Sequence, residues 1–172
     1  MIHETNEVKN LIIVDEVETF NSIYSKDYVP QKYIEKIKQS NLLLLPNEKF
    51  RDNVNCSFPE FTMEIYRYLK LNKQISTEIC IDDEEYKTLE LHSEVINIPI
   101  MIIEYAILPI VLNMIASWLY DKVKAMNKKP EETSTNVNVI VEKNKKSKRI
   151  VYQGSIENFG EVIKNINEKL HF

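Results

Sequence analysis

Acidic residues follow two of the predicted strands, and they are the side chains of this chain that could bind a metal ion. Asp15 comes directly after the apolar run 9–14. Asp82 and Asp83 follow the strand predicted over 75–81. In an open α/β sheet the ligand site lies at the carboxyl ends of the strands, and paired carboxylates there bind Mg²⁺. One hypothesis is therefore a small metal-dependent enzyme that acts on nucleic acid or a nucleotide. Against it, no Lys, His or Thr completes a recognisable phosphoryl-transfer site, and acids are common in turns.

Other reactive side chains form weaker patterns. Glu85 and Lys87 have the acid-x-Lys spacing of many metal-dependent nucleases, but such triplets arise by chance in a chain this rich in Glu and Lys. Cys56 has no evident His and acid partner for nucleophilic catalysis, and His92 is predicted to be a surface residue at a strand end. The chain has only two Gly, which excludes a Gly-rich phosphate loop, and we expect no metal and no cofactor.

A basic turn is the densest positive feature and the main candidate for partner binding. It consists of Lys143, Lys145, Lys146, Lys148 and Arg149. Such a cluster could contact a partner's acidic face, a phosphate backbone or anionic lipid, or it could be a solvated turn. Tyr152 is its only nearby aromatic residue, so stacking on nucleobases is poorly supported. Trp118, in the apolar segment that precedes the basic turn, is a further candidate for contact with a partner.

The longest apolar segment is the element around which the rest of the chain must be arranged. Residues 96–120 contain one charge, Glu104, and are long enough either to cross a bilayer or to form the central helix of a soluble domain. A surface that contacts a partner or a second copy of the chain is the third alternative. Pro109 lies in the middle of the segment and predicts a kink or break there. Beyond it, polar side chains share one helical face, which favours a helix with one side packed on a core. These are Asn113, Ser117, Asp121 and Lys124.

The first 95 residues predict the element order β-α-β-α-β-β. Leu42–Leu45 is a buried strand closed by Pro46, and residues 47–57 are a polar connection. Residues 57–60 (SFPE) form a capping box that would start a helix reaching Lys70. The apolar run 9–14 predicts another buried strand, and residues 75–81 and 86–92 predict a hairpin.

The remaining residues predict a polar linker and then a β-β-α module. Val137, Val139 and Val141 alternate with other residues, the basic turn follows, and 149–153 return as the partner strand before a last helix. The expected fold is therefore α+β. It has a small mixed sheet with helices over 1–95, a long kinked apolar helix over 96–126, and a basic hairpin plus helix over 127–172.

Charge is distributed unevenly along the chain. Residues 1–95 carry 11 Lys and Arg against 18 Asp and Glu, and residues 121–172 carry 11 against 7. The two flanks of the apolar segment therefore attract each other or attract different partners. The polar N-terminus is not a signal peptide, and two Cys without a metal or disulfide pattern favour a cytoplasmic protein. Association with the inner membrane through 96–120 is the alternative.

The C-terminal half also resembles a known group of proteins. A kinked apolar helix (ILPIVLNMIASWLYDKVK) precedes a strand pair (NVNVIVEKNKKSKRIVYQG) that ends at Gly154 and a short helix (FGEVIKNINEKL). Over about residues 98–170 this arrangement resembles the effector-associated constant components of prokaryotic conflict systems. Those are α+β accessory proteins encoded beside variable effectors in bacterial anti-phage defence loci, without established catalytic residues. The resemblance implies an interaction or adaptor role.

The leading hypothesis is therefore a non-enzymatic subunit that docks onto larger proteins of an antiviral defence complex. The expected partner is a protein, with a weak contact to nucleic-acid phosphates through the basic turn and a homo-oligomer as further alternatives. The metal-dependent enzyme and the membrane-anchored module are the rival hypotheses.

Overall fold

Strands from the whole length of the chain form one large mixed sheet. The structure is a computed structural model that describes residues 10–51, 54–89 and 94–172, apart from the side chains of 49–51 and 54–55. The strands are β1 (Leu11–Glu16), β2 (Leu42–Leu45), β3 (Asn47–Arg51), β4 (Val54–Pro59), β5 (Thr77–Ile79), β6 (Thr88–Leu89), β7 (Ile96–Asn97), β8 (Ile100–Glu104), β9 (Ser134–Lys143) and β10 (Lys146–Ser155). Within the described residues, the large sheet has seven strands in the order β1-β10-β9-β8-β2-β5, with β7 also paired to β9. A second sheet has the order β3-β4-β6.

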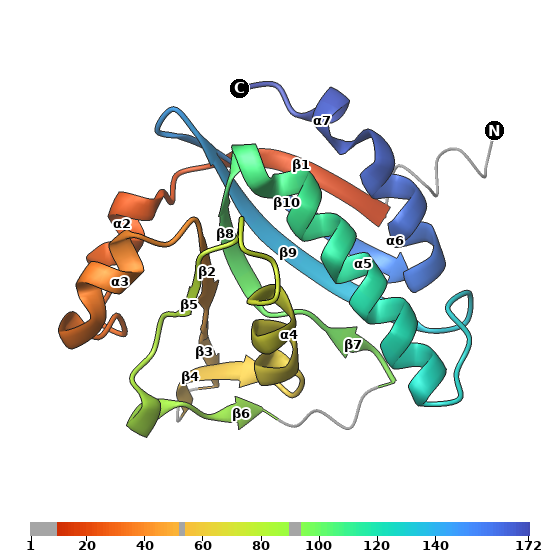
Figure 1. Ribbon diagram of the computed structural model, residues 1–172, viewed down its shortest axis with the longest axis horizontal. Helices are drawn as coiled ribbons and strands as arrows, with labels where there is room; N and C mark the ends of the chain where they lie inside the picture. Colours follow the sequence, from red (N-terminus) through yellow and green to blue (C-terminus); the bar gives the residue numbers. More distant parts are fainter. Residues whose placement is uncertain (1–9, 52–53, 90–93) are drawn as a thin grey trace.

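The helices lie unequally on the two faces of the large sheet. They are α2 (Phe20–Tyr24), α3 (Ile34–Lys38), α4 (Thr62–Leu69), α5 (Leu108–Ala125), α6 (Ile156–Val162) and α7 (Ile166–Lys169), with short 3₁₀ turns η1 (Gln31–Tyr33), η2 (Asp83–Glu85), η3 (Tyr105–Ile107) and η4 (Ile163–Asn165). Helices α4, α5, α6 and α7 lie together on one side, and α2 and α3 lie at one end of the molecule (Figure 1). The α+β fold predicted from the sequence is confirmed.

Alternating side chains of the central strands enter two separate cores. Leu42, Leu44 and Val139 belong to the main cluster, which also holds Leu112 and Ile115 of α5. Leu43 and Ile140 point to the opposite face, where they pack with α2 and α3 in a smaller cluster. Because successive side chains of a strand point to opposite faces, the fully apolar sequence of β2 marks a strand that is buried on both sides.

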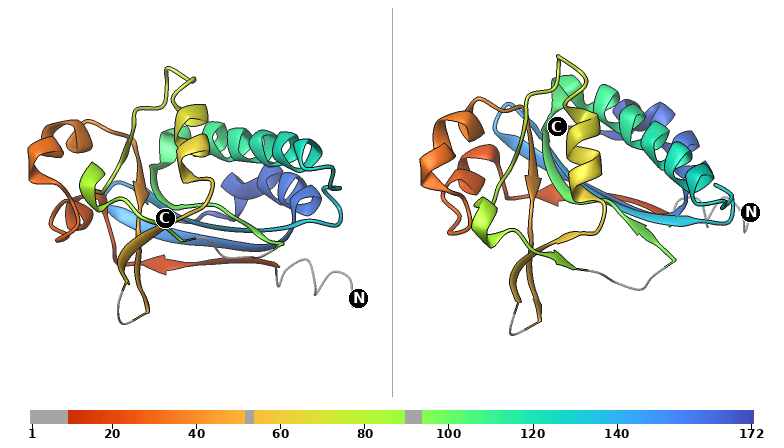
Figure 2. Two further views of the ribbon diagram at one scale, coloured as in Figure 1. Left: turned by 90° about the horizontal axis from the view of Figure 1, so that it is seen from below. Right: turned by 60° about the horizontal axis from the view of Figure 1, so that its bottom comes forward.

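The second face of the sheet is covered only in part. The smaller cluster reaches β2, β8, one residue of β9 and Cys80 just after β5, but the face formed by β1, β10 and most of β9 has no helix over it in the described part of the chain. Figure 2 shows β1 on the side of the sheet away from α5, with the hairpin of β3 and β4 projecting past the sheet on that same side. This uncovered area, which carries Ile12, Val14, Asn138, Arg149 and Val151, is called the open face.

Two expectations for the apolar segment were wrong. Residues 96–107 do not start the helix: they form β7, β8 and η3, and β8 lies between β2 and β9. The helix α5 starts at Leu108 with Pro109 in its first turn, so there is no kink inside the helix at Pro109. The physical reason is that a first-turn N–H has no partner within a helix, which makes Pro favourable there. Residues 100–103 are β-branched or apolar and fit a strand buried on both faces.

The remainder of α5 behaves as the sequence predicts. Its polar stripe, made of Asn113, Ser117, Asp121 and Lys124, is exposed, and the opposite side packs on the main cluster. Residues Tyr105–Ala125 nevertheless form a helical segment of 21 residues that is long and apolar enough to cross a membrane by length and composition. A core helix of a soluble protein passes the same criterion.

Several local expectations in the first 95 residues were also wrong. The strand β1 is not buried: Ile12 is 52% exposed and Val14 46%, because β1 is an edge strand with one face on the core. Ser57 lies in β4 rather than at a helix cap, and α4 starts at Thr62 without a side-chain cap. Residues 47–57 contain the β3–β4 hairpin instead of a polar connection.

The hairpin predicted over 75–92 does not form in the described residues. β5 pairs with β2, and β6 pairs with β4 in the second sheet, each in parallel. Residues 90–92 of the predicted second strand lie outside the described residues. The predicted C-terminal hairpin is confirmed, since β9 and β10 pair antiparallel from Lys143↔Lys146 to Ser134↔Ser155. Strands from all three predicted segments contribute to one sheet.

Candidate interaction surface

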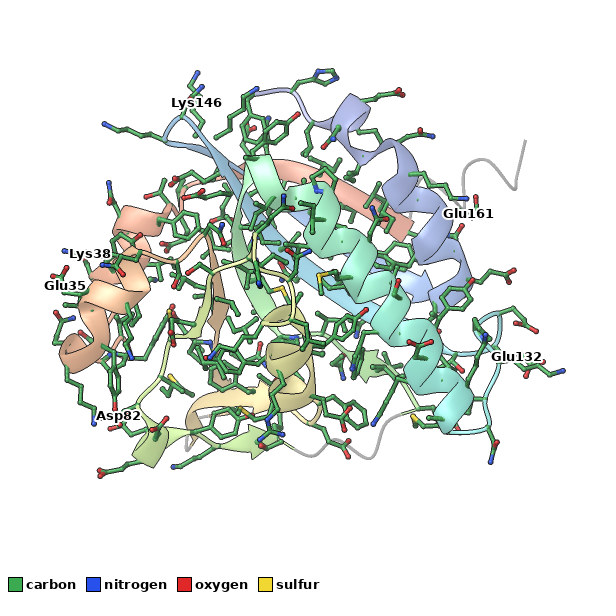
Figure 3. All side chains as sticks on the ribbon, viewed as in Figure 1. Glu35, Lys38, Asp82, Glu132, Lys146 and Glu161 are labelled. Atoms are coloured by element: carbon green, nitrogen blue, oxygen red, sulfur yellow. The ribbon has the colours of Figure 1, made fainter. Side chains whose placement is uncertain are left out.

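The acidic residues proposed as metal ligands lie on opposite edges of the large sheet. Asp15 is in β1, and Asp82 and Asp83 follow β5. Five strand spacings separate these edges, which is about 24 Å at about 4.8 Å per spacing. Asp82 instead pairs with Lys32 at 3.2 Å, at the corner of the molecule labelled in Figure 3. Within the described residues no group of three or more His, Cys, Asp or Glu side chains could hold a metal ion.

The two cysteines have the properties of structural thiols. Burial raises the pKa of Cys80 to about 12, with a smaller contribution from Glu78. Burial and the carboxylates of Glu48 and Glu85 raise the pKa of Cys56 as well. Reactive cysteines have a lowered pKa, so neither thiol is activated for nucleophilic attack. His92 and His3 lie outside the described residues.

The basic turn is a tight hairpin tip formed by two residues. Asn144 and Lys145 have positive φ values of 52° and 67°, which is the backbone of a type I′ turn between paired strands. Asn tolerates this conformation well, and the turn exposes Lys143, Lys145 and Lys146 to solvent. Figure 3 shows Lys146 pointing away from the rest of the molecule. The structure therefore brings the five predicted basic residues into one hairpin, as the sequence indicates.

Two of the five basic residues are paired within the chain. Lys148 forms an ion pair with Asp15, and the Arg149 Nε donates to Glu16 at 2.6 Å. Arg149 Nη1 also donates to Asn138 at 2.7 Å. The hydrogen bond and charge of Lys148 lower the pKa of Asp15. The acidic end of β1 and the basic start of β10 are thus held together.

Glu16 is in a more buried environment than Asp15. Its side chain is 12% exposed, against 89% for Asp15. Burial alone would raise the pKa of Glu16, but hydrogen bonds from Arg149 and from the backbone N–H of Glu18 outweigh that effect and the pKa is lowered. The carboxylate is therefore stable in its charged form at neutral pH.

Lys143 and Trp118 both contact aromatic rings of their own chain. The Lys143 Nζ lies 4.6 Å from the centre of the Tyr105 ring, a cation–π distance. Trp118 is 8% exposed and its ring packs against Phe61 at 5.9 Å between ring centres. Trp118 is therefore a core residue of α5, and Lys145 and Lys146 are the basic residues of the tip that remain directed at solvent without an ion pair in the described part of the molecule.

The open face presents apolar and amide side chains together. Ile12 and Val14 come from β1, Arg149 and Val151 from β10, and Asn138 from β9. Alternation along each strand places all five on the side away from α5, because their neighbours Ile13, Ile150 and Val139 belong to the main core. A mixed apolar and amide surface with one internally paired Arg is typical of a protein-binding area, in which charged groups are few at the centre.

A groove extends the open face toward the second sheet. Its volume is about 440 Å³, and its lining residues come from β3, β4, β7, β9 and β10 and from the segments beside them. Its polar lining includes the amides of Asn47, Asn97, Asn136, Asn138 and Gln153, together with the carboxylates of Glu48 and Glu60. Asn136 Nδ2 donates to Asn97 Oδ1 at 2.8 Å, which orders two of them. An amide both donates and accepts, so these side chains can pair with the peptide groups of an extended segment.

The open face and the groove were not predicted from the sequence. Their residues come from strands that are far apart in the chain, so no single local pattern contains all of them. The alternation of Asn136 and Asn138 with Val137 and Val139 was a usable signal, because a strand with amides on one face indicates a surface that is not covered by apolar helices.

Comparison of the chain with models of protein families, with characterised proteins and with solved structures gives no match.

Proposed function

We propose that this chain is a non-enzymatic interaction subunit that binds a larger protein through the open face and the adjoining groove. The observation that carries the proposal is the half-covered sheet. One face is packed along its width by α4, α5 and α6, while on the other face β1 exposes Ile12 and Val14 and β10 carries the half-exposed Val151. Exposed apolar residues grouped on one surface, with polar groups around them, mark a site of protein association.

The groove chemistry agrees with a protein partner. Amide side chains match the donors and acceptors of a peptide backbone, and the apolar part of the face would exclude water from those bonds. The basic tip lies at the far end of the same hairpin, where Lys145 and Lys146 can attract an acidic surface and increase the rate of association.

The resemblance of residues 98–170 to effector-associated components provides the biological context of the proposal. The partner would then be a larger effector of an anti-phage defence complex. Two free thiols and a helix with its apolar side packed on the sheet are consistent with a cytoplasmic location. The same helix meets the length and composition criterion for a membrane span, which makes membrane association the competing location.

The test is to isolate the partner and then change the open face. A tagged chain is purified with its partners from its native cells, and the partners are identified and quantified by mass spectrometry. Val151→Glu places a charge in the centre of the open face, and Ser117→Glu places the same charge on the exposed side of α5 as a control. We expect the amount of partner recovered with the tagged chain to fall at least about tenfold for Val151→Glu and to stay unchanged for Ser117→Glu. Equal recovery with both variants, each with a wild-type circular dichroism spectrum, would overturn the proposal.

The metal-dependent enzyme predicts a different set of results. Under the proposed function, Asp15→Asn and Asp82→Asn retain partner binding, and Mg²⁺ or Mn²⁺ does not raise the melting temperature of the wild type. A metal-induced rise that both substitutions abolish would favour the enzyme instead.

A further inference from the structure

The outer edge of β1 has no strand partner within the described residues. β1 is the first strand in the sheet order and pairs only with β10. Exposed edge strands are usually protected by Lys, Pro, a bulge or a covering segment, because their free N–H and C=O groups pair with other chains. Residues 11–14 (LIIV) contain no charge and no Pro, and the β1–β10 register is regular.

The tight turn of the neighbouring hairpin shows which groups of β1 point outward. A two-residue type I′ turn makes Lys143 and Lys146 a hydrogen-bonded pair, and hydrogen-bonded pairs then recur at every second residue. Lys148 and Ile150 therefore direct their N–H and C=O groups toward β9. Arg149 and Val151 direct theirs toward β1.

The partners of these two residues in β1 complete the assignment. Arg149 is opposite Val14, and Val151 is opposite Ile12, so Val14 and Ile12 bond to β10. Consequently Leu11, Ile13 and Asp15 direct their N–H and C=O groups away from the sheet.

We propose that two copies of this chain pair antiparallel through β1, with the two-fold axis at Ile13, so that their large sheets form one continuous sheet. In this register Ile13 is opposite Ile13 of the second copy, and Leu11 is opposite Asp15. These three hydrogen-bonded pairs use the outward groups of both strands and give about six backbone hydrogen bonds.

The side chains of β1 are self-complementary in this register. Ile12 lies opposite Val14 of the second copy in a non-hydrogen-bonded pair, where side chains are closest. The half-exposed Ile12 and Val14 of both copies then form one apolar patch on the open face. On the opposite side of the sheet, Ile13 packs on the main core and meets its own copy.

The charges of β1 also fit this pairing. Asp15 and Glu16 lie at one end of the strand, so in an antiparallel pair the acids of the two copies are at opposite ends and no like charges face each other. A pairing centred on Asp15 would place two carboxylates directly opposite each other. Lys148 and Arg149 already neutralise these acids within each copy.

The dimer goes beyond the proposed function, and a backbone substitution can test it separately. Asp15→Pro removes an outward N–H and places a proline ring at the interface. Asp15→Ala keeps that N–H and loses the same Lys148 ion pair, so it is the matched control. Pro is tolerated on an edge strand when its N–H would face outward, so both variants are expected to fold. Both also keep the open-face side chains, so partner binding through that face remains measurable in each.

Sedimentation equilibrium of the full chain measures the result. A strand pair buries less than the roughly 800 Å² per partner of a standard interface, so we expect a reversible dimer that dissociates in the range of about 10–100 µM. Asp15→Pro should raise the dissociation constant about tenfold or more, and Asp15→Ala should leave it within about twofold. A wild type that stays monomeric up to about 500 µM, or equal dissociation constants for the two variants, would overturn the proposal.

Cysteine cross-linking tests the register. Ile12→Cys and Val14→Cys chains, mixed under mild oxidation, should form a disulfide between the two different chains, because these positions are opposite each other. Each variant alone should form little dimer through that cysteine. Self-linking of Ile12→Cys as strong as the mixed product would contradict a two-fold axis at Ile13.

Discussion

Two adjacent ion pairs join β1 to β10, and they differ in how deeply they are buried. Asp15 with Lys148 is close to solvent, and an exposed pair of this kind contributes little to stability. Glu16 with Arg149 is mostly shielded, and Arg149 also donates to Asn138. Removing one member of a shielded pair leaves the other as an unpaired buried charge, which is costly.

Replacing Arg149 by Ala is therefore expected to destabilise the chain by about 1–3 kcal/mol, because Glu16 and Asn138 both lose a hydrogen-bond partner. Lys148→Ala, the neighbouring control, should change the melting temperature much less. Urea denaturation followed by circular dichroism measures both at neutral pH. Equal stability of the two variants would contradict the role given to Arg149.

The same pair predicts a pH dependence. The pKa of Glu16 is lowered in the folded chain from an ordinary value of 4.5, so its pairing stabilises the fold fully above about that pH and loses this contribution as the pH falls through the lowered pKa. Without Arg149, only the hydrogen bond from the backbone N–H of Glu18 opposes the effect of burial, so the pKa of Glu16 in the folded chain is higher than in the wild type. The stability difference between wild type and Arg149→Ala should therefore shrink as the pH falls below about 4.5, and a constant difference down to pH 3 would count against it.

Replacing each of the two glycines of the chain by Ala should change the stability of the fold in opposite directions. A Cβ at Gly154 would lie 2.8 Å from the hydroxyl oxygen of Tyr152, which donates to the carbonyl of Ser155 at 2.7 Å. At Gly160, inside α6, the nearest atom outside its own helix lies 3.9 Å away, in Tyr120. We expect Gly154→Ala to cost about 1–3 kcal/mol and Gly160→Ala to add about 0.5–1 kcal/mol of stability.

Thermal unfolding of these two variants beside the wild type measures the difference directly. The result would be contradicted if Gly154→Ala melts at or above the wild-type temperature, because Tyr152 would then have room to move without losing its hydrogen bond.

At the scale of elements, the sequence predicted the pieces that depend on local pattern. The β9–β10 hairpin, the buried strand β2 and the polar stripe of α5 follow from alternation, an apolar run and helical spacing. It did not predict β8, because an apolar run that leads into a helix cannot be distinguished from that helix by periodicity. Pro109 was assigned to the middle of a helix for the same reason, although it lies in the first turn.

Of the candidate site, only the basic hairpin tip was predicted from the sequence. The five basic residues of the hairpin tip are close in sequence, so their clustering was predictable. The open face combines β1 with β9 and β10, and Asn97 of the groove lies next to Asn136 through a parallel pairing of distant segments. Such pairings depend on the packing of the whole sheet, and no local spacing in the sequence records them.

The packing of α5 leads to a prediction about its environment. Its apolar side contacts the main cluster through Leu112, Ile115 and Leu119, and its other side carries exposed Asn113, Ser117 and Asp121. Burying that polar side in lipid would be costly. The full chain should therefore remain in the supernatant after ultracentrifugation without detergent. Recovery only in the membrane fraction after a carbonate wash would show that the helix leaves the sheet and enters the bilayer.

At the scale of the whole molecule, the uneven charge of the sequence is partly neutralised by the fold. Acids of the first 95 residues meet basic residues of the last 52 in Asp15–Lys148, Glu16–Arg149 and Glu64–Lys122. These pairs come from different layers, since Lys122 and Glu64 join α5 to α4. The positive charge that the fold leaves unpaired at the hairpin is then concentrated at its tip.

That tip gives a prediction that separates recognition from stability. Lys145 and Lys146 are exposed beside the turn, whereas Lys148 and Arg149 are paired and Lys143 covers the Tyr105 ring. The double substitution Lys145→Glu, Lys146→Glu should leave the melting temperature within about 2 °C of the wild type, because surface substitutions away from buried groups change stability little. It reverses the charge that would attract an acidic partner, so recovery of the native partner should fall several-fold. Raising the salt concentration should weaken the wild-type association in the same direction, since screening acts most strongly on exposed charges.

The double substitution Lys124→Glu, Lys128→Glu changes the net charge equally at exposed positions away from the tip and serves as the control. If the tip variant recovers as much partner as this control at both low and high salt, the basic hairpin is a solvated turn and recognition depends on the open face alone.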